Sequence, residues 1–147
     1  MNLEPGATAE VSLVVPAERT AHAMGNPGAH ILATPFVIGL LENAAAAVLH
    51  SHLPPGATTV GTMVEMRHLA ATPVGMTVRA KATLLETDGK RFLFAVEARD
   101  DKEKIAEGRH ERYLVTDLAK FINRAMRKLS CEPQDVAGLG PRRPRRA

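Results

Sequence analysis

The most constraining feature of the chain is an almost wholly apolar segment that runs from Phe36 to Leu49. Within it, Glu42 and Asn43 are the only polar residues. A segment of this composition is typical of a helix that is buried on most sides. It is too short to cross a bilayer, which requires about 20 apolar residues. The rest of the chain must therefore supply a surface that covers this helix.

One acidic residue lies on the face of this helix that we expect to be buried. Five apolar side chains at helical spacing form that face: Ile38, Leu41, Ala45, Ala46 and Leu49. Glu42 falls among them, and a carboxylate on a buried face is unfavourable unless it is paired or used. At the start of the helix we expect Thr34 as the N-cap and Pro35 at the first helical position, where its missing N–H is no loss. Glu42 is therefore the first candidate for a functional residue.

Composition limits the class of protein. A length of 147 residues is typical of one domain. The single cysteine excludes an internal disulfide framework and fits a reducing compartment. The first residues show no signal-peptide pattern, so we expect a cytoplasmic location. Aromatic residues make up only 3% of the chain, too few for a base-stacking surface, and we expect no nucleic-acid and no membrane partner.

Five further segments alternate between apolar and polar residues, which is the pattern of strands with one buried face. They are residues 8–15, 58–69, 76–84, 92–98 and 104–115. Asp88-Gly89 is a hairpin signal between the third and the fourth. One long helix against a five-stranded, mainly antiparallel sheet is an α+β layer architecture. A sheet wrapped around one central helix is the outline of the hotdog fold.

The remaining segments are a long loop, a second helix and a polar tail. Residues 17–33 contain Gly and Pro and are expected to form a loop of a length often found in lids or binding segments. Thr116 or Asp117 can cap a short amphipathic helix that ends near Leu129. We therefore expect one domain over residues 1–129 and a disordered tail containing Arg and Pro over residues 130–147.

Three parts of the chain carry a resemblance to a known family. The first is residues 33–42, ATPFVIGLLE. The second comprises Gly61-Thr62 and residues 67–75, RHLAATPVG, and the third is residues 108–112, GRHER. In this order and at this spacing they resemble the fluoroacetyl-CoA thioesterase family of hotdog-fold thioesterases. The resemblance covers the chain from the first strand to the final helix.

The resemblance implies which residues form the site. It places the family's catalytic Thr, Glu and His at Thr34, Glu42 and His68, and its substrate-contacting residues at Gly61 and Arg112. It implies hydrolysis of a short-chain acyl-CoA thioester to the acid and free CoA, with no metal ion and no cofactor. The family's lid loop carries phenylalanines before the helix, whereas residues 24–32 contain none. This departure leaves the acyl group open.

Each of these residues also has an interpretation without catalysis. Glu42 is either a base or nucleophile, or a buried acid neutralised by Arg112 or a histidine. Thr34 either polarises a thioester carbonyl at the helix N-terminus or is only an N-cap. His68 is either a proton-transfer group or a structural histidine. Gly61 marks either a close approach of ligand to backbone or a bulge, and Arg112 binds either a substrate oxygen or a neighbouring glutamate.

The spacing of Thr34 and Glu42 predicts an assembly. Eight residues along a helix separate the two by roughly 12 Å, too far to act on one carbonyl within one subunit. A two-fold dimer with antiparallel central helices would bring Thr34 of one subunit towards Glu42 of the other. We therefore expect a homodimer with two sites at the subunit interface.

Two other functions compete with an acyl-CoA thioesterase. A hotdog enoyl-CoA hydratase or dehydratase would use an Asp/His pair, but the sequence has no Asp near the start of the long helix. A non-catalytic module would bind acyl-CoA or another small ligand without turnover.

Overall fold

The structure, a computed structural model, describes residues 3–130, so the expected tail lies outside the described residues except for Ser130. The elements, in chain order, are β1 (Thr8–Val14), the 3-10 turn η1 (Ala17–Arg19), α1 (Thr34–His50), β2 (Thr58–His68), β3 (Thr77–Thr87), β4 (Arg91–Arg99), β5 (Lys104–Val115), α2 (Leu118–Met126) and the 3-10 turn η2 (Arg127–Ser130). All five predicted strands and both predicted helices are present, and their bounds differ from the expected ones by a few residues.

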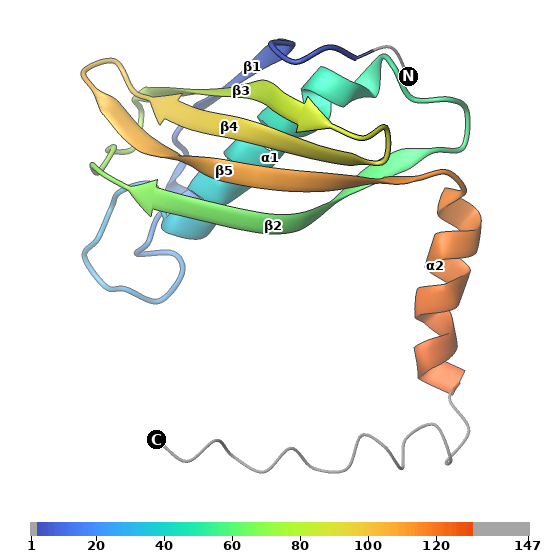
Figure 1. The fold of residues 1–147 in the computed structure, drawn as a ribbon. Coiled ribbons are helices and arrows are strands. Elements are labelled where there is room, and N and C mark those ends of the chain that lie inside the picture. Colours follow the sequence, from blue (N-terminus) through green and yellow to red (C-terminus); the bar gives the residue numbers. More distant parts are fainter. Residues whose placement is uncertain (1–2, 131–147) are drawn as a thin grey trace, which may run out of the picture.

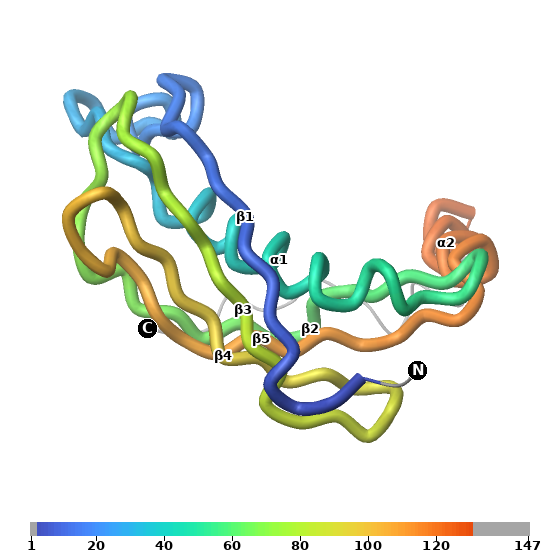
Figure 2. The backbone as a smooth tube through the Cα atoms, turned by 90° about the horizontal axis from the view of Figure 1, so that it is seen from above, coloured from blue at the N-terminus to red at the C-terminus, as the bar shows by residue number. Residues whose placement is uncertain are grey.

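The five strands form one sheet in the order β1-β3-β4-β5-β2, and every pairing is antiparallel. The sheet curves around α1, which lies along its concave face (Figures 1 and 2). Strands β1 and β2 are the two edges. The expected architecture, a sheet wrapped around one central helix, is confirmed.

The core lies between α1 and the inner face of the sheet. The side chains expected to face inward from β3 and β4 are buried, namely Val78, Ala80, Ala82, Leu84, Phe92, Phe94, Val96 and Ala98. The buried face of α1 is wider than expected and consists of Val37, Leu40, Leu41, Ala44, Ala45, Val48 and Leu49. Ile38 and Ala46 are only half-buried, and so is Glu42 beside them. The acid therefore lies at the border of the buried face.

The start of α1 differs from the expectation. Ala33 is the N-cap, Thr34 is the first helical residue, and no side chain caps the helix. The carbonyl of Ala33 accepts hydrogen bonds from the N–H groups of Phe36 at 3.0 Å and Val37 at 3.1 Å. The prediction of Thr34 as the N-cap is wrong, because its hydroxyl bonds to a side chain on the sheet instead.

Strand β2 contains a bulge that changes which residues face α1. Gly61 pairs with Arg112 and Met63 pairs with Glu111, so Thr62 is an extra residue on β2. The strict alternation predicted for residues 58–69 is therefore wrong at this point. Gly61 comes to the same face as Val64, Met66 and His68, rather than to the opposite face.

The second helix begins as expected and extends beyond the sheet. The carboxylate of Asp117 accepts a hydrogen bond from the Lys120 N–H at 3.0 Å and caps α2. In Figure 1, α2 projects past the edge strand β2, and its apolar side chains Leu118, Phe121, Ile122 and Met126 are exposed. Within residues 3–130, no helix combines the length and apolar character needed to cross a membrane.

Candidate active site

The first part of the site joins the start of α1 to the end of β2. The Oγ1 atom of Thr34 lies 2.8 Å from Nδ1 of His68. Thr34 is exposed and His68 is half-buried. The other ring nitrogen of His68, Nε2, is buried and has no hydrogen-bond partner within residues 3–130. A small pocket of about 250 Å³ adjoins His68 and the segment 69–71. The structure thus brings together two of the three predicted catalytic residues.

The second part of the site surrounds Gly61 on the inner face of β2. A Cβ atom placed on Gly61 would lie 3.0 Å from Oε1 of Glu42 and 3.6 Å from Nη1 of Arg112. The missing side chain of Gly61 therefore leaves room in front of a carboxylate and a guanidinium. The structure brings together three of the predicted site residues, Glu42, Gly61 and Arg112. The bulge interpretation of Gly61 also holds, because the glycine begins the bulge and approaches both groups.

The carboxylate of Glu42 forms no hydrogen bond and no ion pair with any described residue. Arg112 is buried and bonds elsewhere: its Nε donates to Oγ1 of Thr59 at 2.9 Å, and its Nη2 donates to the Thr59 carbonyl at 2.8 Å. Burial lowers the pKa of Arg112, and the nearby charge of Glu42 acts in the opposite direction. Glu42 is thus a half-buried acid close to a cation and not bonded to it. Among residues 3–130, no salt bridge neutralises Glu42.

Glu111, the neighbouring acid on β5, does not pair with Arg112 either. Glu111 points to the other face, where it forms an ion pair with Arg91 and accepts a hydrogen bond from Oγ1 of Thr62 at 2.7 Å. These contacts lower the pKa of Glu111, the Thr62 bond being the stronger cause. The further N–H groups of Arg112 remain available on the side of Gly61.

Sequence reasoning missed His110, which lies between Arg112 and the bulge. His110 is fully buried; its Nδ1 lies 2.8 Å from the Met63 carbonyl and its Nε2 lies 3.2 Å from Nη1 of Arg112. Burial lowers the pKa of His110, and the bond to the Met63 carbonyl partly opposes that effect. The sequence contained a signal for it. His110 lies two residues before Arg112 on one strand, so the two side chains must lie on the same inward face.

The two parts of the site lie at different places along α1. Thr34 is its first residue and Glu42 lies about two turns further. One subunit therefore holds a Thr–His pair at one end of the helix and a Glu–Arg–Gly cluster near the middle. Neither part holds all three predicted catalytic residues.

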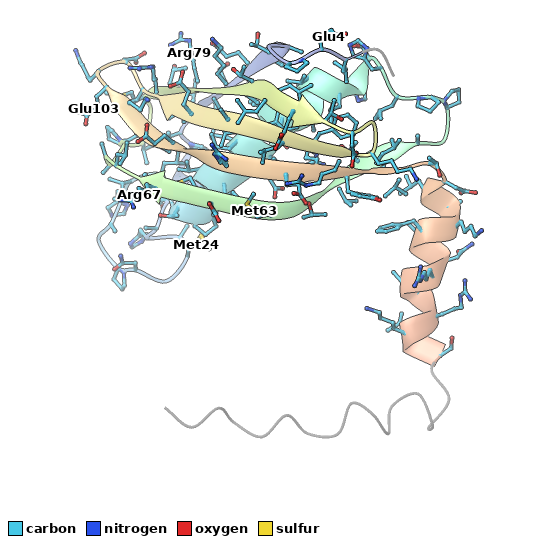
Figure 3. The ribbon with its side chains drawn as sticks, in the orientation of Figure 1. Glu4, Met24, Met63, Arg67, Arg79 and Glu103 are labelled. Carbon is cyan, nitrogen blue, oxygen red and sulfur yellow. The ribbon has the colours of Figure 1, made fainter. Side chains whose placement is uncertain are left out.

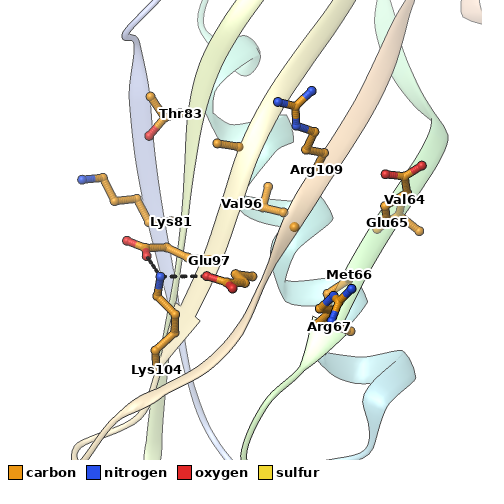
Figure 4. Close-up of a pocket in the computed structure, with 13 residues that line it drawn as sticks. Val64, Glu65, Met66, Arg67, Lys81, Thr83, Val96, Glu97, Lys104 and Arg109 are labelled. Carbon is orange, nitrogen blue, oxygen red and sulfur yellow. Dashed lines mark hydrogen bonds and ion pairs between the residues drawn. The ribbon is translucent and has the colours of Figure 1, made fainter.

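A larger open groove of about 1030 Å³ lies on the opposite, outer face of the sheet (Figure 4). Its lining includes Arg67, Lys81 and Arg109, together with Lys104 bonded to two glutamates. None of the five predicted site residues lines it. Across the described residues, no group of His, Cys, Asp or Glu side chains is arranged to hold a metal ion.

Comparisons with known proteins place the chain in a family. The model of the fluoroacetyl-CoA-specific thioesterase family matches residues 15–117, which include every residue of both clusters. A fluoroacetyl-CoA thioesterase of Streptantibioticus cattleyicolor is 37% identical over 98 residues, covering 67% of this chain and 70% of that protein.

Solved structures show the same relationship. A variant of the fluoroacetyl-CoA thioesterase FlK in complex with acetyl-CoA superposes with a TM-score of 0.81 at 31% identity, covering 86% of this chain and 98% of that one. A hot-dog-like protein from Thermanaerovibrio acidaminovorans shares the fold, with a TM-score of 0.79 at 21% identity over 88% of this chain and 96% of that one. The hotdog fold is thereby confirmed, and the chain belongs to the fluoroacetyl-CoA-specific thioesterase family.

Proposed function

We propose that the protein hydrolyses short-chain acyl-CoA thioesters to the free acid and CoA. The observation that carries the proposal is the unbonded carboxylate of Glu42 beside Gly61 and Arg112. Membership of a thioesterase family supports the reaction. The match to a FlK variant solved with acetyl-CoA supports a short acyl group.

Glu42 is suited to act on the thioester carbonyl. A carboxylate without a hydrogen-bonded partner can take a proton from an attacking water or attack the carbonyl itself. The absence of a side chain at Gly61 lets the carboxylate of Glu42 lie close to the β2 backbone, and we place the acyl group beside this contact. The free N–H groups of Arg112 face the same space and can bind a substrate oxygen. These three residues are our proposed acyl-binding half of the site.

Thr34 and His68 are suited to activate the same carbonyl from the other side. The first N–H groups of a helix have no intrahelical partner, and they favour negative charge. At this helix start Pro35 has no N–H, and the N–H groups of Phe36 and Val37 bond to the Ala33 carbonyl. A thioester oxygen placed beside Thr34 would therefore meet the N–H and the hydroxyl of Thr34. His68, whose Nδ1 is bonded to the hydroxyl, can exchange a proton with Thr34 through this contact.

We infer that a homodimer completes the site. Strand β2 is an edge strand of 11 residues, so the backbone groups on its outer side have no partner in the sheet. Antiparallel pairing of β2 with β2 of a second copy would extend the sheet and set the two α1 helices antiparallel on one face. Thr34 and His68 of one subunit would then approach Glu42 of the other.

Two finer points belong to the same proposal. We expect a cytoplasmic location, in keeping with the single cysteine of the chain.

The second point concerns the substrate. The loop before α1 contains no phenylalanine, and its Met24 side chain is exposed (Figure 3). We therefore propose acetyl-CoA or a similar short acyl-CoA as substrate rather than a fluoroacetyl-specific site.

A thiol-release screen tests this function. The full-length protein would be assayed with acyl-CoA esters of increasing chain length and with fluoroacetyl-CoA, and free CoA would be measured with a thiol reagent. We expect turnover that declines as the acyl chain lengthens. Tight binding of every ester without thiol release would instead favour a non-catalytic acyl-CoA-binding protein. Loss of enoyl-CoA absorbance without thiol release would favour a hydratase.

A further inference from the structure

Strand β5 carries a histidine that none of the proposed steps uses. His110 has no exposed surface. On its two sides in the sheet it pairs with Val64 of β2 and Phe94 of β4. A fully buried imidazole needs partners for its ring nitrogens, and both nitrogens of His110 have one.

The partners of His110 define its protonation. A backbone carbonyl only accepts hydrogen bonds, so Nδ1 must carry the proton that is donated to Met63 at 2.8 Å. A guanidinium only donates, so Nε2 must present its lone pair to Nη1 of Arg112 at 3.2 Å. A single neutral tautomer satisfies both contacts. An imidazolium would have a proton on Nε2 and would repel Arg112.

The hydrogen bond between Arg112 and Nε2 of His110 orients the guanidinium. Arg112 is oriented by three bonds: two to Thr59 and one to His110. The bond to His110 is made by Nη1, the same atom that lies 3.6 Å from the position of a Cβ on Gly61. His110 therefore sets how the guanidinium is presented to the space above Gly61.

The hydrogen bond from Nδ1 of His110 to the Met63 carbonyl stabilises the bulge in β2. Met63 follows the extra residue Thr62, and its carbonyl is tied to His110 on the inner face. On the outer face the hydroxyl of Thr62 is tied to Glu111. Two adjacent residues of β5 thus fix the bulge from both faces, and with it the position of Gly61.

We propose that His110 is a positioning residue of the thioesterase site. As the neutral tautomer with its proton on Nδ1, it holds Arg112 and the bulge at Gly61 in the geometry that receives the acyl-CoA. It donates no proton to the substrate and takes none from it. This inference rests on the proposed acyl-binding role of Gly61 and Arg112.

Two substitutions separate the two bonds. In His110→Asn, the amide nitrogen occupies the place of Nδ1, so the bond to Met63 is kept and the acceptor for Arg112 is lost. In His110→Gln, the amide oxygen occupies the place of Nε2, so the acceptor for Arg112 is kept and the bond to Met63 is lost. Arg112→Lys supplies the second arm of a double-mutant cycle.

We expect His110→Asn to lower kcat/KM about ten-fold, in line with the loss of one hydrogen bond to a charged group. Because the lost contact is the one to Arg112, the double variant with Arg112→Lys should be no slower than Arg112→Lys alone. His110→Gln should keep most of the coupling to residue 112. A double variant whose loss equals the product of the single losses would overturn the proposal, since it would leave His110 a packing role only.

A measurement without substrate tests the same proposal independently. Nitrogen NMR of histidine-labelled protein reports which ring nitrogen carries the proton, and comparison with His110→Asn assigns the His110 signals. We expect a protonated Nδ1 and an unprotonated Nε2 at neutral pH. A proton on Nε2 would overturn the positioning role even in an active thioesterase. An inactive protein with the expected tautomer would instead count against the proposed function.

Discussion

Oγ1 of Thr34 and Nδ1 of His68 lie 2.8 Å apart, although 34 residues of chain separate them. The contact ties the first residue of α1 to the last residue of β2. It also explains why Thr34 does not cap its own helix, since its hydroxyl is already engaged. The same contact places a hydroxyl, an imidazole and the backbone N–H of Thr34 within one small region.

This contact predicts how Thr34 variants behave. Thr34→Val keeps the shape of the side chain and removes the hydroxyl, so we expect thiol release to slow by about 100-fold, the lower end for loss of acid–base assistance. Thr34→Ser keeps the hydroxyl and should retain most of the activity. The melting temperature should change little in either variant, because residue 34 is exposed. A Val variant as fast as the Ser variant would leave Thr34 without a chemical role.

Mixed dimers test whether the two parts of the site come from different copies. Thr34→Ala and Glu42→Gln chains with different tags would be co-expressed, and the mixed dimer would carry one intact site. A statistical mixture should regain roughly a quarter of the wild-type activity, because half of the dimers are mixed and half of their sites are whole.

The matched control combines Thr34→Ala with His68→Ala. Thr34 and His68 meet within one copy, so no mixed dimer of this pair restores an intact site. Recovery in both mixtures, or in neither, would contradict a site shared between subunits.

Gly61 is expected to tolerate no side chain without loss of activity. In Gly61→Ala the added methyl group would lie 3.0 Å from Oε1 of Glu42 and 3.1 Å from Cε1 of His110. The two side chains must shift by a few tenths of an ångström, and we expect kcat/KM to fall about ten-fold or more because the reacting groups are displaced. The thiol-release assay and the melting temperature should be measured together. Unchanged kcat/KM in a folded Gly61→Ala protein would show that this space is not used by substrate.

The buried histidine predicts how stability depends on pH. Burial holds the pKa of His110 below its ordinary value of 6.5. Below about pH 6.5 the unfolded chain therefore binds a proton that the folded chain does not, so the free energy of unfolding falls as the pH falls through this window. The groups around His110 are the guanidinium of Arg112 and the carboxylates of Glu42 and Glu111, and the two carboxylates oppose the shift.

Urea unfolding at several pH values between 7 and 5 measures this effect, with His110→Gln as the variant that lacks the titrating group. We expect the wild-type protein to lose more stability than the variant over this range. Equal slopes would mean that the folded protein accommodates a charged His110. At lower pH a separate loss of stability should follow from Asp100. Burial raises the pKa of its carboxyl, but hydrogen bonds from the N–H of Lys102, the hydroxyl of Thr72 and the N–H of Glu103 lower it by more, so the pKa lies below its ordinary value.

The fold was readily predicted because its signals are local. Period-two alternation defined the inward faces of β3 and β4, where Val78 and Phe94 are fully buried. A bulge in β2 was one of two interpretations of Gly61, and the strand's own alternation did not decide between them, because the bulge depends on the pairing of Gly61 and Met63 with neighbouring residues of β5. One extra residue moved Gly61 to the other face. The long-range pairing, and not the strand's own pattern, decides this.

Five site residues were predicted from the sequence, and their roles stay predictions. The structure brings Thr34 to His68 and Glu42 to Gly61, a grouping that the sequence did not predict. The N-cap assignment of Thr34 was wrong because a tertiary bond competes with the local one. His110 was missed although it lies two positions before Arg112 on one strand, because the strand pattern alone did not show that the guanidinium is buried and uses a ring nitrogen as an acceptor. A requirement that every buried guanidinium has partners would have pointed to it.

Glu42 is the residue on which the proposed reaction depends most directly. The decisive measurement is thiol release from acetyl-CoA by Glu42→Gln, which keeps the size of the side chain and removes its charge and basicity. The wild-type protein, measured in parallel, is the control for the assay. Glu42→Asn is the control for side-chain length. We predict that Glu42→Gln binds the ester but releases thiol at least about 100-fold more slowly than the wild type. Equal rates for Glu42→Gln and the wild type would contradict Glu42 as the catalytic carboxylate.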